Sequence, residues 1–222
     1  MSASLLALDL RASLPPCRQQ GQRETCASFA ATAAHEMARS GHSFSEEHAH
    51  WASQELAPRT TEARPVSEVL VGIAGLGHAA AEDWQYGSPR YTNGIPDEAT
   101  TAAAISRRRT PEGWREVGAL ELAEVADLLH TGASVVLSLG VVPGAWVSAA
   151  KDGWVSTGAA SVAPVGHAVA AVGVRVPVGI GPAAIIFRNS AGPKWGDRGY
   201  GYLTAEYLQA HCWTAHVVEK IT

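Results

Sequence analysis

The chain changes character about halfway along, and this change limits its fold more than any other feature. The first half carries apolar residues at helical spacing, whereas the second half has runs of β-branched residues that glycine and proline separate. Helices that precede the strands, instead of alternating with them, predict an α+β fold rather than βαβ units. We therefore expect a helical lobe packed on a sheet lobe, with a binding cleft at their boundary.

Helical spacing and end signals predict four helices. They cover residues 26–38, Ser45 to about Leu56, about Pro65 to Leu76, and Leu120 to His130 with Gly132 as the stop signal. Three β-branched runs are expected to be strands, namely Val135–Val142, Val165–Val176 and Ala184–Arg188. No repeat or linker divides the chain. The prediction is one domain over residues 1–222, with the helical lobe at about 12–118 and the sheet lobe at about 119–222.

The first helix begins at a cysteine. Thr25 is expected to cap it, because its hydroxyl can accept a hydrogen bond from an unpaired N–H of the first turn. Cys26 then lies at the positive end of the helix dipole, which favours a thiolate. Apolar residues at helical spacing are expected to share one face of this helix: Cys26, Phe29, Ala30, Ala33 and Met37.

Composition excludes several classes of partner. The net charge of −4 offers no basic surface for nucleic acid, and the basic run Arg107–Arg109 is expected to be a solvated loop. No stretch reaches the ~18 apolar residues of a membrane helix. Met1–Leu10 lacks the basic start and apolar centre of a signal peptide. We expect no nucleic acid and no membrane as partners.

The cysteine and histidine spacings predict neither disulfides nor a metal site. Cys17, Cys26 and Cys212 are an odd number at wide spacing, so no disulfide framework or CxxC motif can be drawn. His42, His48 and His50 are close together in the sequence. His48 and His50 fall on different sides of a helix, however, which argues against a zinc site. The expectation is a reduced, cytoplasmic protein with no metal and no cofactor.

Three residues have the chemistry of a thiol-based catalytic centre. A sulfur nucleophile needs help to ionise, a base to move the proton, and donors for a developing oxyanion. Cys26 fits the first need. His167, at the start of an apolar strand after Gly166, is the best base among nine histidines. Asn189 follows the next strand, where it could accept from the imidazole and fix its tautomer. Taken singly, each is as well explained as a core cysteine, a structural histidine and a turn asparagine.

Three segments together resemble the papain family of cysteine peptidases. Gln20-Gly-Gln-Arg-Glu-Thr-Cys-Ala-Ser-Phe29 resembles the active-site segment, with glutamine six residues before the cysteine. Gly166-His-Ala-Val-Ala-Ala-Val-Gly173 resembles the histidine strand, and Asn189-Ser-Ala-Gly-Pro-Lys-Trp-Gly-Asp-Arg-Gly-Tyr200 the asparagine motif. Weaker similarity at Asp9-Leu-Arg11 and Phe44-Ser-Glu-Glu47 extends the match over nearly the whole chain, closest to compact bacterial members.

The resemblance implies a two-lobed papain-like fold, with an antiparallel sheet or barrel as its second lobe, and cysteine endopeptidase activity. By this resemblance Cys26 attacks the scissile carbonyl and His167 is its ion-pair partner and proton donor to the leaving amine. Asn189 orients the imidazole. The Gln20 side-chain amide and the Cys26 backbone N–H form the oxyanion hole. Substrate-binding positions carried over are Glu24, Val136, Gly166 and Ala168.

The chain departs from the family pattern at several positions. Ala27 and Ala191 replace two tryptophans, the second of which normally covers the His–Asn hydrogen bond. Trp195 or Trp213 could shield that bond instead. Arg23 stands where secreted members have a disulfide cysteine, which agrees with a reducing compartment. Glu24 replaces a glycine; it is either a solvated loop carboxylate or a group that attracts a Lys or Arg of the substrate.

Two other functions stay open at this point. The chain could be a catalytically weak member whose cleft serves recognition, or an acyltransferase or amidase that uses the same nucleophile. About eight residues precede Asp9-Leu-Arg11, so no inhibitory propeptide is visible. Control is then expected from an activating or inhibitory protein partner, a fused domain, or restriction to specific protein or peptide substrates.

Overall fold

The second half of the chain forms the sheet that carries most of the structure. The computed structural model describes residues 5–40, 42–87, 98–107, 113–156, 165–177 and 182–220. Its strands are β1 Leu8–Asp9, β2 Trp114–Val117, β3 Ser134–Gly140, β4 Trp154–Val155, β5 Gly166–Arg175, β6 Ala184–Arg188, β7 Tyr200–Thr204 and β8 Cys212–Val218. They form one eight-stranded sheet in the order β2-β8-β3-β5-β6-β7-β4, with β1 paired to β5. All pairs are antiparallel except β4 with β7.

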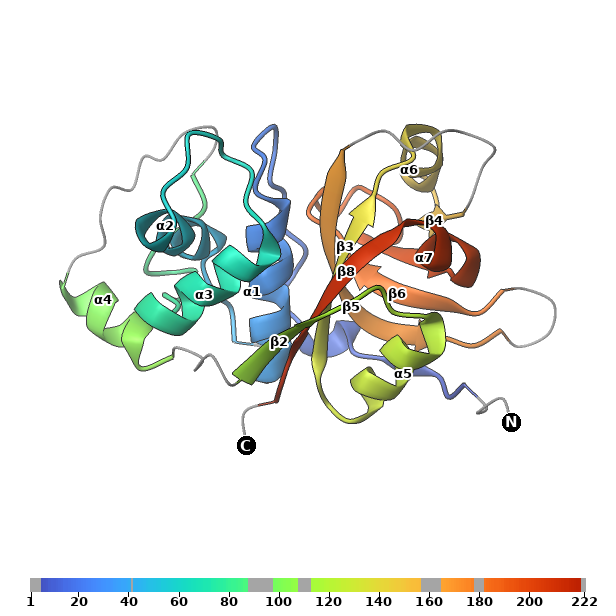
Figure 1. Cartoon of the computed structure of the whole chain (residues 1–222), viewed down its shortest axis with the longest axis horizontal. Helices are drawn as coiled ribbons and strands as arrows, with labels where there is room; N and C mark the ends of the chain where they lie inside the picture. Colours follow the sequence, from blue (N-terminus) through green and yellow to red (C-terminus); the bar gives the residue numbers. More distant parts are fainter. Residues whose placement is uncertain are drawn as a thin grey trace.

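The first half supplies the helices beside the sheet. The helices are α1 Cys26–Ala38, α2 Glu46–Leu56, α3 Val66–Leu76, α4 Glu98–Ile105, α5 Leu122–His130, α6 Pro143–Ala149 and α7 Ala205–His211, with a short 3-10 turn at Arg11–Ser13. In Figure 1, α1 to α4 lie on one side of the molecule and the sheet with α5 to α7 on the other. This arrangement confirms the predicted α+β class and its two lobes.

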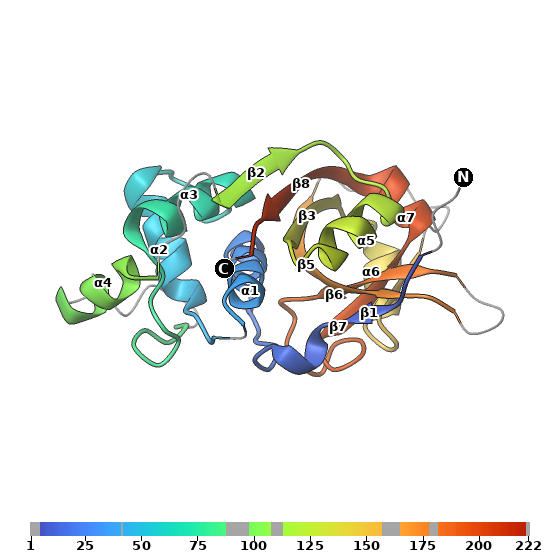
Figure 2. The same ribbon diagram turned by 90° about the horizontal axis from the view of Figure 1, so that it is seen from below.

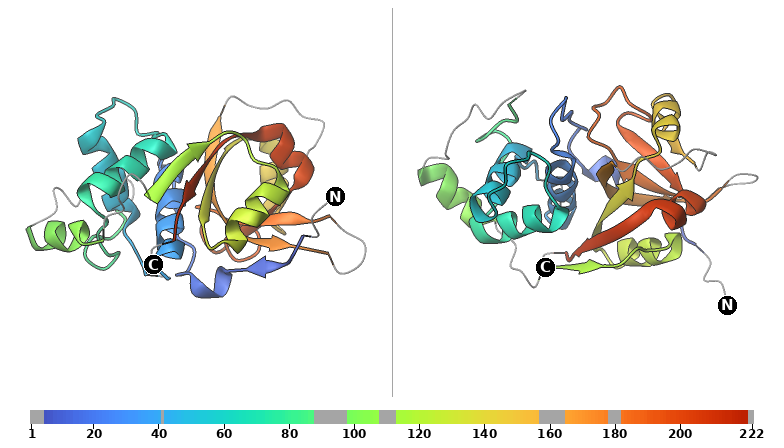
Figure 3. Two further views of the ribbon diagram at one scale, coloured as in Figure 1. Left: turned by 60° about the horizontal axis from the view of Figure 1, so that its bottom comes forward. Right: turned by 45° about the horizontal axis from the view of Figure 1, so that its top comes forward.

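Helix α1 lies between the sheet and the other helices of its own lobe, α2 to α4, as Figures 2 and 3 show. It packs on α2 and α3 on one side and on β5 and β3 on the other. Its alanines, among them Ala27 and Ala31, join Val136 and Ala168 in a shared apolar cluster. Small side chains let the helix approach the strands closely, which brings the first residue of α1 next to the sheet. The single apolar face predicted for this helix is too narrow, since nearly every position is buried.

Strand β5 is apolar almost throughout because both of its faces are covered. Ala168 and Ala170 pack in the clusters next to α1, whereas Val169 and Ala171 face the core of the sheet lobe. A strand buried on both faces has a continuous apolar run instead of an alternating one. The other two predicted strands, β3 and β6, pair with it on either side, and β6 is the neighbour expected from the positions of His167 and Asn189.

Several short elements carried no usable sequence signal. Helices α4, α6 and α7 and strands β1, β2, β4, β7 and β8 were not predicted. Strand β2 lies within the first 118 residues, yet it pairs with β8 at the edge of the sheet. Of the basic run, residues 108 and 109 lie outside the described part of the chain, and Arg107 donates to the carbonyl of His78. Within the described residues, no helix has the length and apolar character needed to cross a membrane.

The predicted cap on α1 is wrong in its chemistry. Thr25 does occupy the N-cap position, but its side chain makes no capping hydrogen bond. Its hydroxyl lies 2.8 Å from the hydroxyl of Tyr86 instead. The tertiary partner outcompetes the local one, so the start of α1 is tied to the loop after Trp84.

A single buried carboxylate ties three parts of the fold together. Glu36, on α1, has no exposed side-chain surface and accepts from Arg18 at 2.7 Å and from Arg188 at 2.6 Å. Its Oε1 also accepts from the backbone N–H of Phe44 at 3.1 Å. Glu36 thereby joins α1 to the N-terminal segment, to the start of the α2 region and to β6.

Glu36→Gln is expected to destabilise the fold by about 3–5 kcal/mol, because the buried Arg188 guanidinium loses the carboxylate that balances its charge, whereas Arg18 keeps its pair with Glu46. Urea unfolding at pH 7 measures the loss. Asp9→Asn is the control, since Asp9 is 47% exposed in its pair with Arg11 and exposed pairs contribute at most about 1 kcal/mol. Equal losses in the two variants would contradict the prediction.

Candidate active site

Cys26 lies where the helical lobe meets the sheet. It is the first residue of α1 and is half-buried against the alanine-rich cluster between helix and sheet. The other two cysteines, Cys17 and Cys212, are buried, and burial raises the pKa of both thiols. Of the three, only Cys26 has a lowered thiol pKa.

His167 and Asn189 are held together by neighbouring strands. His167 is the second residue of β5, and Asn189 follows β6 directly. His167 Nε2 is 2.9 Å from Asn189 Oδ1. The same oxygen accepts from the backbone N–H of Ser190 at 2.8 Å, which fixes the orientation of the amide. Since an amide oxygen only accepts, Nε2 carries the hydrogen and Nδ1 is the ring atom left for Cys26.

The thiol and the imidazole shift each other toward a charged pair. Burial raises the pKa of the Cys26 thiol, but hydrogen bonding and charge attraction from His167, with backbone N–H groups of Ala168 and Ala27, more than offset it and lower the pKa. Burial lowers the pKa of His167, and Cys26 and Asn189 outweigh that effect and raise it. Both shifts favour thiolate and imidazolium over the neutral pair.

Gln20 bridges the two sides of the site. Its backbone N–H donates to the carbonyl of Ser190 at 2.8 Å. Its side-chain oxygen accepts from the Ser190 hydroxyl, and its Nε2 donates to the carbonyl of Arg23 at 2.6 Å. The Gln20 amide therefore ties the turn before Cys26 to the turn that carries Asn189, and Gln20 and Cys26 line the same cleft.

A tryptophan that the sequence did not single out covers the histidine. Trp146, on α6, lies edge-on to the His167 ring with centroids 5.0 Å apart and planes at 89°. Its Nε1 donates to Tyr207 Oη at 2.7 Å, and Trp195 stacks against it at 6.0 Å. Trp146 supplies the aromatic contact expected from Trp195 or Trp213. Periodicity could not have found it, because a helix of seven residues, Pro143–Ala149, is too short to give a usable pattern.

Both lobes line a cleft of about 810 Å³ around Cys26 and His167. Of the predicted substrate-binding residues, Glu24, Gly166 and Ala168 line it. Val136 does not, since it is fully buried beneath the cleft in the cluster that contacts α1. Ser138, two residues along the same strand and paired with Ala168, lines the cleft instead. Register explains the shift, because positions two apart share a face of the strand.

Strands β2 and β8 add further residues to the cleft, and those of β8 fall in the stretch Cys212 to His216 where a residue closing the substrate pocket was expected. Trp213 covers Gly166 so closely that an added Cβ there would lie 2.8 Å from the indole ring. His216 and Glu116 also line the cleft, with Nε2 and Oε2 3.2 Å apart. Burial lowers the pKa of His216, and Glu116 only partly opposes this. These residues come from a strand pair at the sheet edge that was not predicted.

Metal-based chemistry has no candidate site in the described part of the chain, where no group of three or more His, Cys, Asp or Glu side chains is arranged to hold an ion. His48 packs on Trp51 and Trp84, and His50 lies 3.3 Å from the hydroxyl of Ser28.

A helical lobe and an antiparallel sheet lobe that meet at a cysteine and a histidine define the fold of papain-like cysteine proteases. Comparison with solved structures agrees. Xylellain, a cysteine protease from Xylella fastidiosa, superposes with a TM-score of 0.79 over 99% of this chain and 88% of its own, at 18% identity. Digestive procathepsin L 3 from Tenebrio molitor gives a TM-score of 0.77 over 98% of this chain and 71% of its own, at 18% identity.

A third structure is of similar length. The Carica candamarcensis cysteine protease CMS1MS2, solved in complex with E-64, gives a TM-score of 0.67 at 19% identity, over 97% of this chain and 99% of its own. No protein-family model matches the sequence. No curated protein matches it either. The chain thus has the papain-like cysteine protease fold, although its sequence is only 18–19% identical to these proteins.

Proposed function

We propose that the protein is a cysteine endopeptidase that hydrolyses peptide bonds through an acyl-enzyme intermediate. The observation that carries the proposal is the series Cys26, His167 and Asn189, with Cys26 and His167 at the wall of an open cleft, Asn189 buried behind the imidazole, and pKa shifts of thiol and imidazole that favour the ion pair. A core cysteine with a structural histidine would have no need of this charged arrangement.

In the proposed reaction the Cys26 thiolate attacks the scissile carbonyl carbon, and the carbonyl electrons move onto oxygen. The Gln20 amide and the Cys26 backbone N–H donate to that oxyanion. The His167 imidazolium protonates the leaving amine as the C–N bond breaks, leaving a thioester. His167 then takes a proton from water, the hydroxide attacks the thioester, and the acid product leaves with regeneration of the thiolate. Asn189 holds the imidazole in the orientation that both proton transfers need.

The proposed binding surface beside Cys26 is mainly apolar on the sheet side. Gly166 and Ala168 present little side-chain volume, and Trp213 forms a wall above Gly166. Small apolar residues there suit aliphatic or modest aromatic side chains of a peptide. Val136 contributes from beneath by holding the strand, and Ser138 takes its place at the surface.

Glu24 is proposed to attract a basic side chain next to the scissile bond. It is exposed at the cleft on the turn that leads to Cys26. Glu24→Gln is expected to reduce kcat/KM for peptides with Lys or Arg before the scissile bond by roughly fivefold, as one exposed charge pair contributes up to about 1 kcal/mol. Peptides with Ala at that position are the control. An unchanged Lys-to-Ala preference would show that Glu24 is only a solvated carboxylate.

We further propose a cytoplasmic protease that acts on few protein targets and is controlled by a partner or by substrate restriction. Support for a reducing compartment comes from the free thiols of Cys17, Cys26 and Cys212 and from Arg23 at the position of a disulfide cysteine in secreted members of the papain family.

The test is intact-mass labelling with an epoxide inhibitor of papain-like enzymes, alongside Cys26→Ala. We expect one adduct on the wild type, none on the variant, and cleavage of a peptide library by the wild type alone. No adduct on a folded, reduced protein would count against the proposal and in favour of a binding role. Peptide fragments joined to an added amine, in place of hydrolysed ends, would identify an acyltransferase instead.

A further inference from the structure

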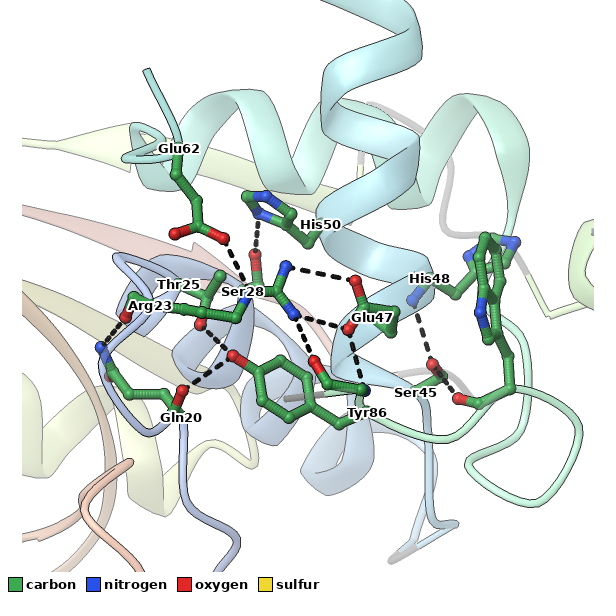
Figure 4. Close-up of polar contacts among 12 residues, drawn as sticks. Gln20, Arg23, Thr25, Ser28, Ser45, Glu47, His48, His50, Glu62 and Tyr86 are labelled. Carbon is green, nitrogen blue, oxygen red and sulfur yellow. Dashed lines mark hydrogen bonds and ion pairs between the residues drawn. The ribbon is translucent and has the colours of Figure 1, made fainter. Parts of the chain in front are cut away.

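Arg23 is a buried cation three residues before the proposed nucleophile, Cys26. Its side chain is 2% exposed and reaches two carboxylates from different parts of the chain. The guanidinium donates to both oxygens of Glu47, at 2.7 and 3.2 Å, and its Nε donates to Glu62 at 2.6 Å. It also donates to the carbonyl of Gly87 and stacks on the Tyr86 ring, 4.8 Å from its centroid. Figure 4 shows these contacts converging on one side chain.

The same partners hold the backbone on either side of Arg23. Glu62 uses its second oxygen to accept from the N–H of Glu24 at 3.2 Å. Tyr86 donates from its hydroxyl to the carbonyl of Gln20 at 3.0 Å and lies 2.8 Å from the hydroxyl of Thr25. The turn from Gln20 to Thr25 is therefore held at both ends, as Figure 4 shows, and also at the backbone of Glu24. We call Arg23, Glu47, Glu62 and Tyr86 the arginine clasp.

The clasp also sets the orientation of the Gln20 amide. The Arg23 carbonyl can only accept, so the amide nitrogen of Gln20 must face it, at 2.6 Å. The amide oxygen is then the group that meets the Ser190 hydroxyl. With the oxygen and one hydrogen engaged, the second amide hydrogen has a defined direction. Because the acceptor is the backbone of Arg23, any movement of this residue moves the amide.

We propose that Arg23 is a positioning residue that, through its ion pairs with Glu47 and Glu62, holds the Gln20 amide ready to donate to the oxyanion. This inference rests on the proposed function. A planar guanidinium suits the task because it can bond two carboxylates along fixed directions, which a lysine cannot do. The clasp thus supplies, without a covalent bond, the rigidity that an oxyanion donor needs.

Glu62→Gln is the most direct variant. The Glu62 side chain is 26% exposed, and its loss leaves Arg23 balanced by Glu47, so no buried charge is stranded. Glutamine offers one acceptor oxygen for two donors, Arg23 Nε and the Glu24 N–H. Arg23→Lys is the second variant, which keeps the positive charge but loses the planar guanidinium that bonds two carboxylates along fixed directions. Asp9→Asn is the matched control, because Arg11 also keeps a second carboxylate, Asp197.

We expect Glu62→Gln and Arg23→Lys to lower kcat by about tenfold with KM within twofold, a smaller loss than the roughly 100-fold expected when a donor is removed outright in Gln20→Ala. Combined with Gln20→Ala, Glu62→Gln should cause no further loss, since both act on one donor. The pH profile of Cys26 alkylation by iodoacetamide should stay as in the wild type. The inference would be overturned if the losses in kcat multiplied in the double variant of Gln20→Ala and Glu62→Gln, or if the alkylation profile of Glu62→Gln or Arg23→Lys changed. A kcat of these two variants equal to that of Asp9→Asn would also overturn it.

A readout independent of turnover separates this inference from the proposed function. The side-chain amide resonances of Gln20 in nitrogen-15-labelled protein, assigned by their absence in Gln20→Ala, report through their hydrogen exchange how firmly the amide is hydrogen-bonded. We expect slow hydrogen exchange in the wild type and in Asp9→Asn, and faster exchange in Glu62→Gln. Should the wild type hydrolyse no peptide, the proposed function fails while the amide exchange still judges the clasp. Equal exchange in all three proteins would refute the clasp even if the enzyme is active.

Discussion

His167→Ala is expected to lose at least about 10⁴-fold of kcat/KM, because catalytic groups that act as a unit cost nearly the whole effect when one is removed. Two functions disappear together in this variant. The thiol loses the partner that lowers its pKa, and the leaving amine loses its proton donor. The remaining oxyanion donors and binding surface explain the residual rate.

The pH dependence of alkylation gives a sharper test of the same pair. In the wild type the thiol pKa is lowered and the imidazole pKa is raised, so the thiolate forms at a lower pH than an ordinary thiolate and the imidazolium persists to a higher pH than an ordinary one. Iodoacetamide should therefore label Cys26 well below the ordinary thiol pKa of about 8.5. Because the two groups are coupled, the apparent values belong to the pair. In His167→Ala this labelling at acid pH, which we call the acid plateau, should vanish. The labelling rate should then rise only as the pH approaches the ordinary thiol pKa.

Mass spectrometry of the adduct over pH 4–10 measures this profile. His211→Ala, which removes a half-buried histidine on α7, serves as the control and should keep the wild-type curve. If His167→Ala retained the acid plateau, His167 could not be the group that maintains the thiolate.

Acid is expected to destabilise the helical lobe strongly, through histidines buried as neutral rings. Burial lowers the pKa of His48 and of His50 to about 4, and lowers that of His78 well below its ordinary value. The unfolded chain binds these protons near pH 6.5 and the folded chain does not, so stability is complete above that pH and falls as the pH drops toward 4. At pH 5 each of the first two rings costs about 2 kcal/mol.

The contacts of His78 explain why it resists a proton. Its Nε2 lies 3.0 Å from the carbonyl of Ser45, which only accepts, so Nε2 carries the hydrogen. Its Nδ1 therefore accepts from Nδ1 of His35, 2.8 Å away. A second proton on His78 would have to enter at this Nδ1 and would break the bond. Glu46 acts in the opposite direction, because burial raises its carboxyl pKa to about 7 and so favours the folded state in acid.

Urea unfolding at pH 7 and pH 5 measures the net loss. His48→Phe keeps an aromatic ring against Trp51 and Trp84 but cannot titrate, so we expect it to lose about 2 kcal/mol less than the wild type between these pH values. His42→Gln is the control at an exposed histidine and should follow the wild type. Parallel losses in the wild type and His48→Phe would rule out this ring as a source of acid sensitivity.

The sequence alone determined the features that local patterns encode. Helical spacing and turn signals predicted α1 with its bounds, and placed α2, α3 and α5 within two residues of where they begin. β-branched runs predicted β3, β5 and β6. The order of the three motifs indicated that Cys26, His167 and Asn189 would meet, and the structure brings His167 and Asn189 to 2.9 Å. The order of the motifs carries this information because it resembles that of the papain family, whose fold brings the three segments together.

Only the tertiary structure decided the surroundings of these residues. Trp146, which contacts the His167 ring, comes from α6, a helix too short to show periodicity in the sequence. The pairing of β2 with β8 brings Glu116 and His216 to the cleft. The Thr25 hydroxyl contacts the Tyr86 hydroxyl instead of capping α1. Arg23 pairs with Glu47 and Glu62, which follow it in the chain by 24 and 39 residues. Such contacts depend on register and on packing between distant segments, and no local preference of the chain encodes either.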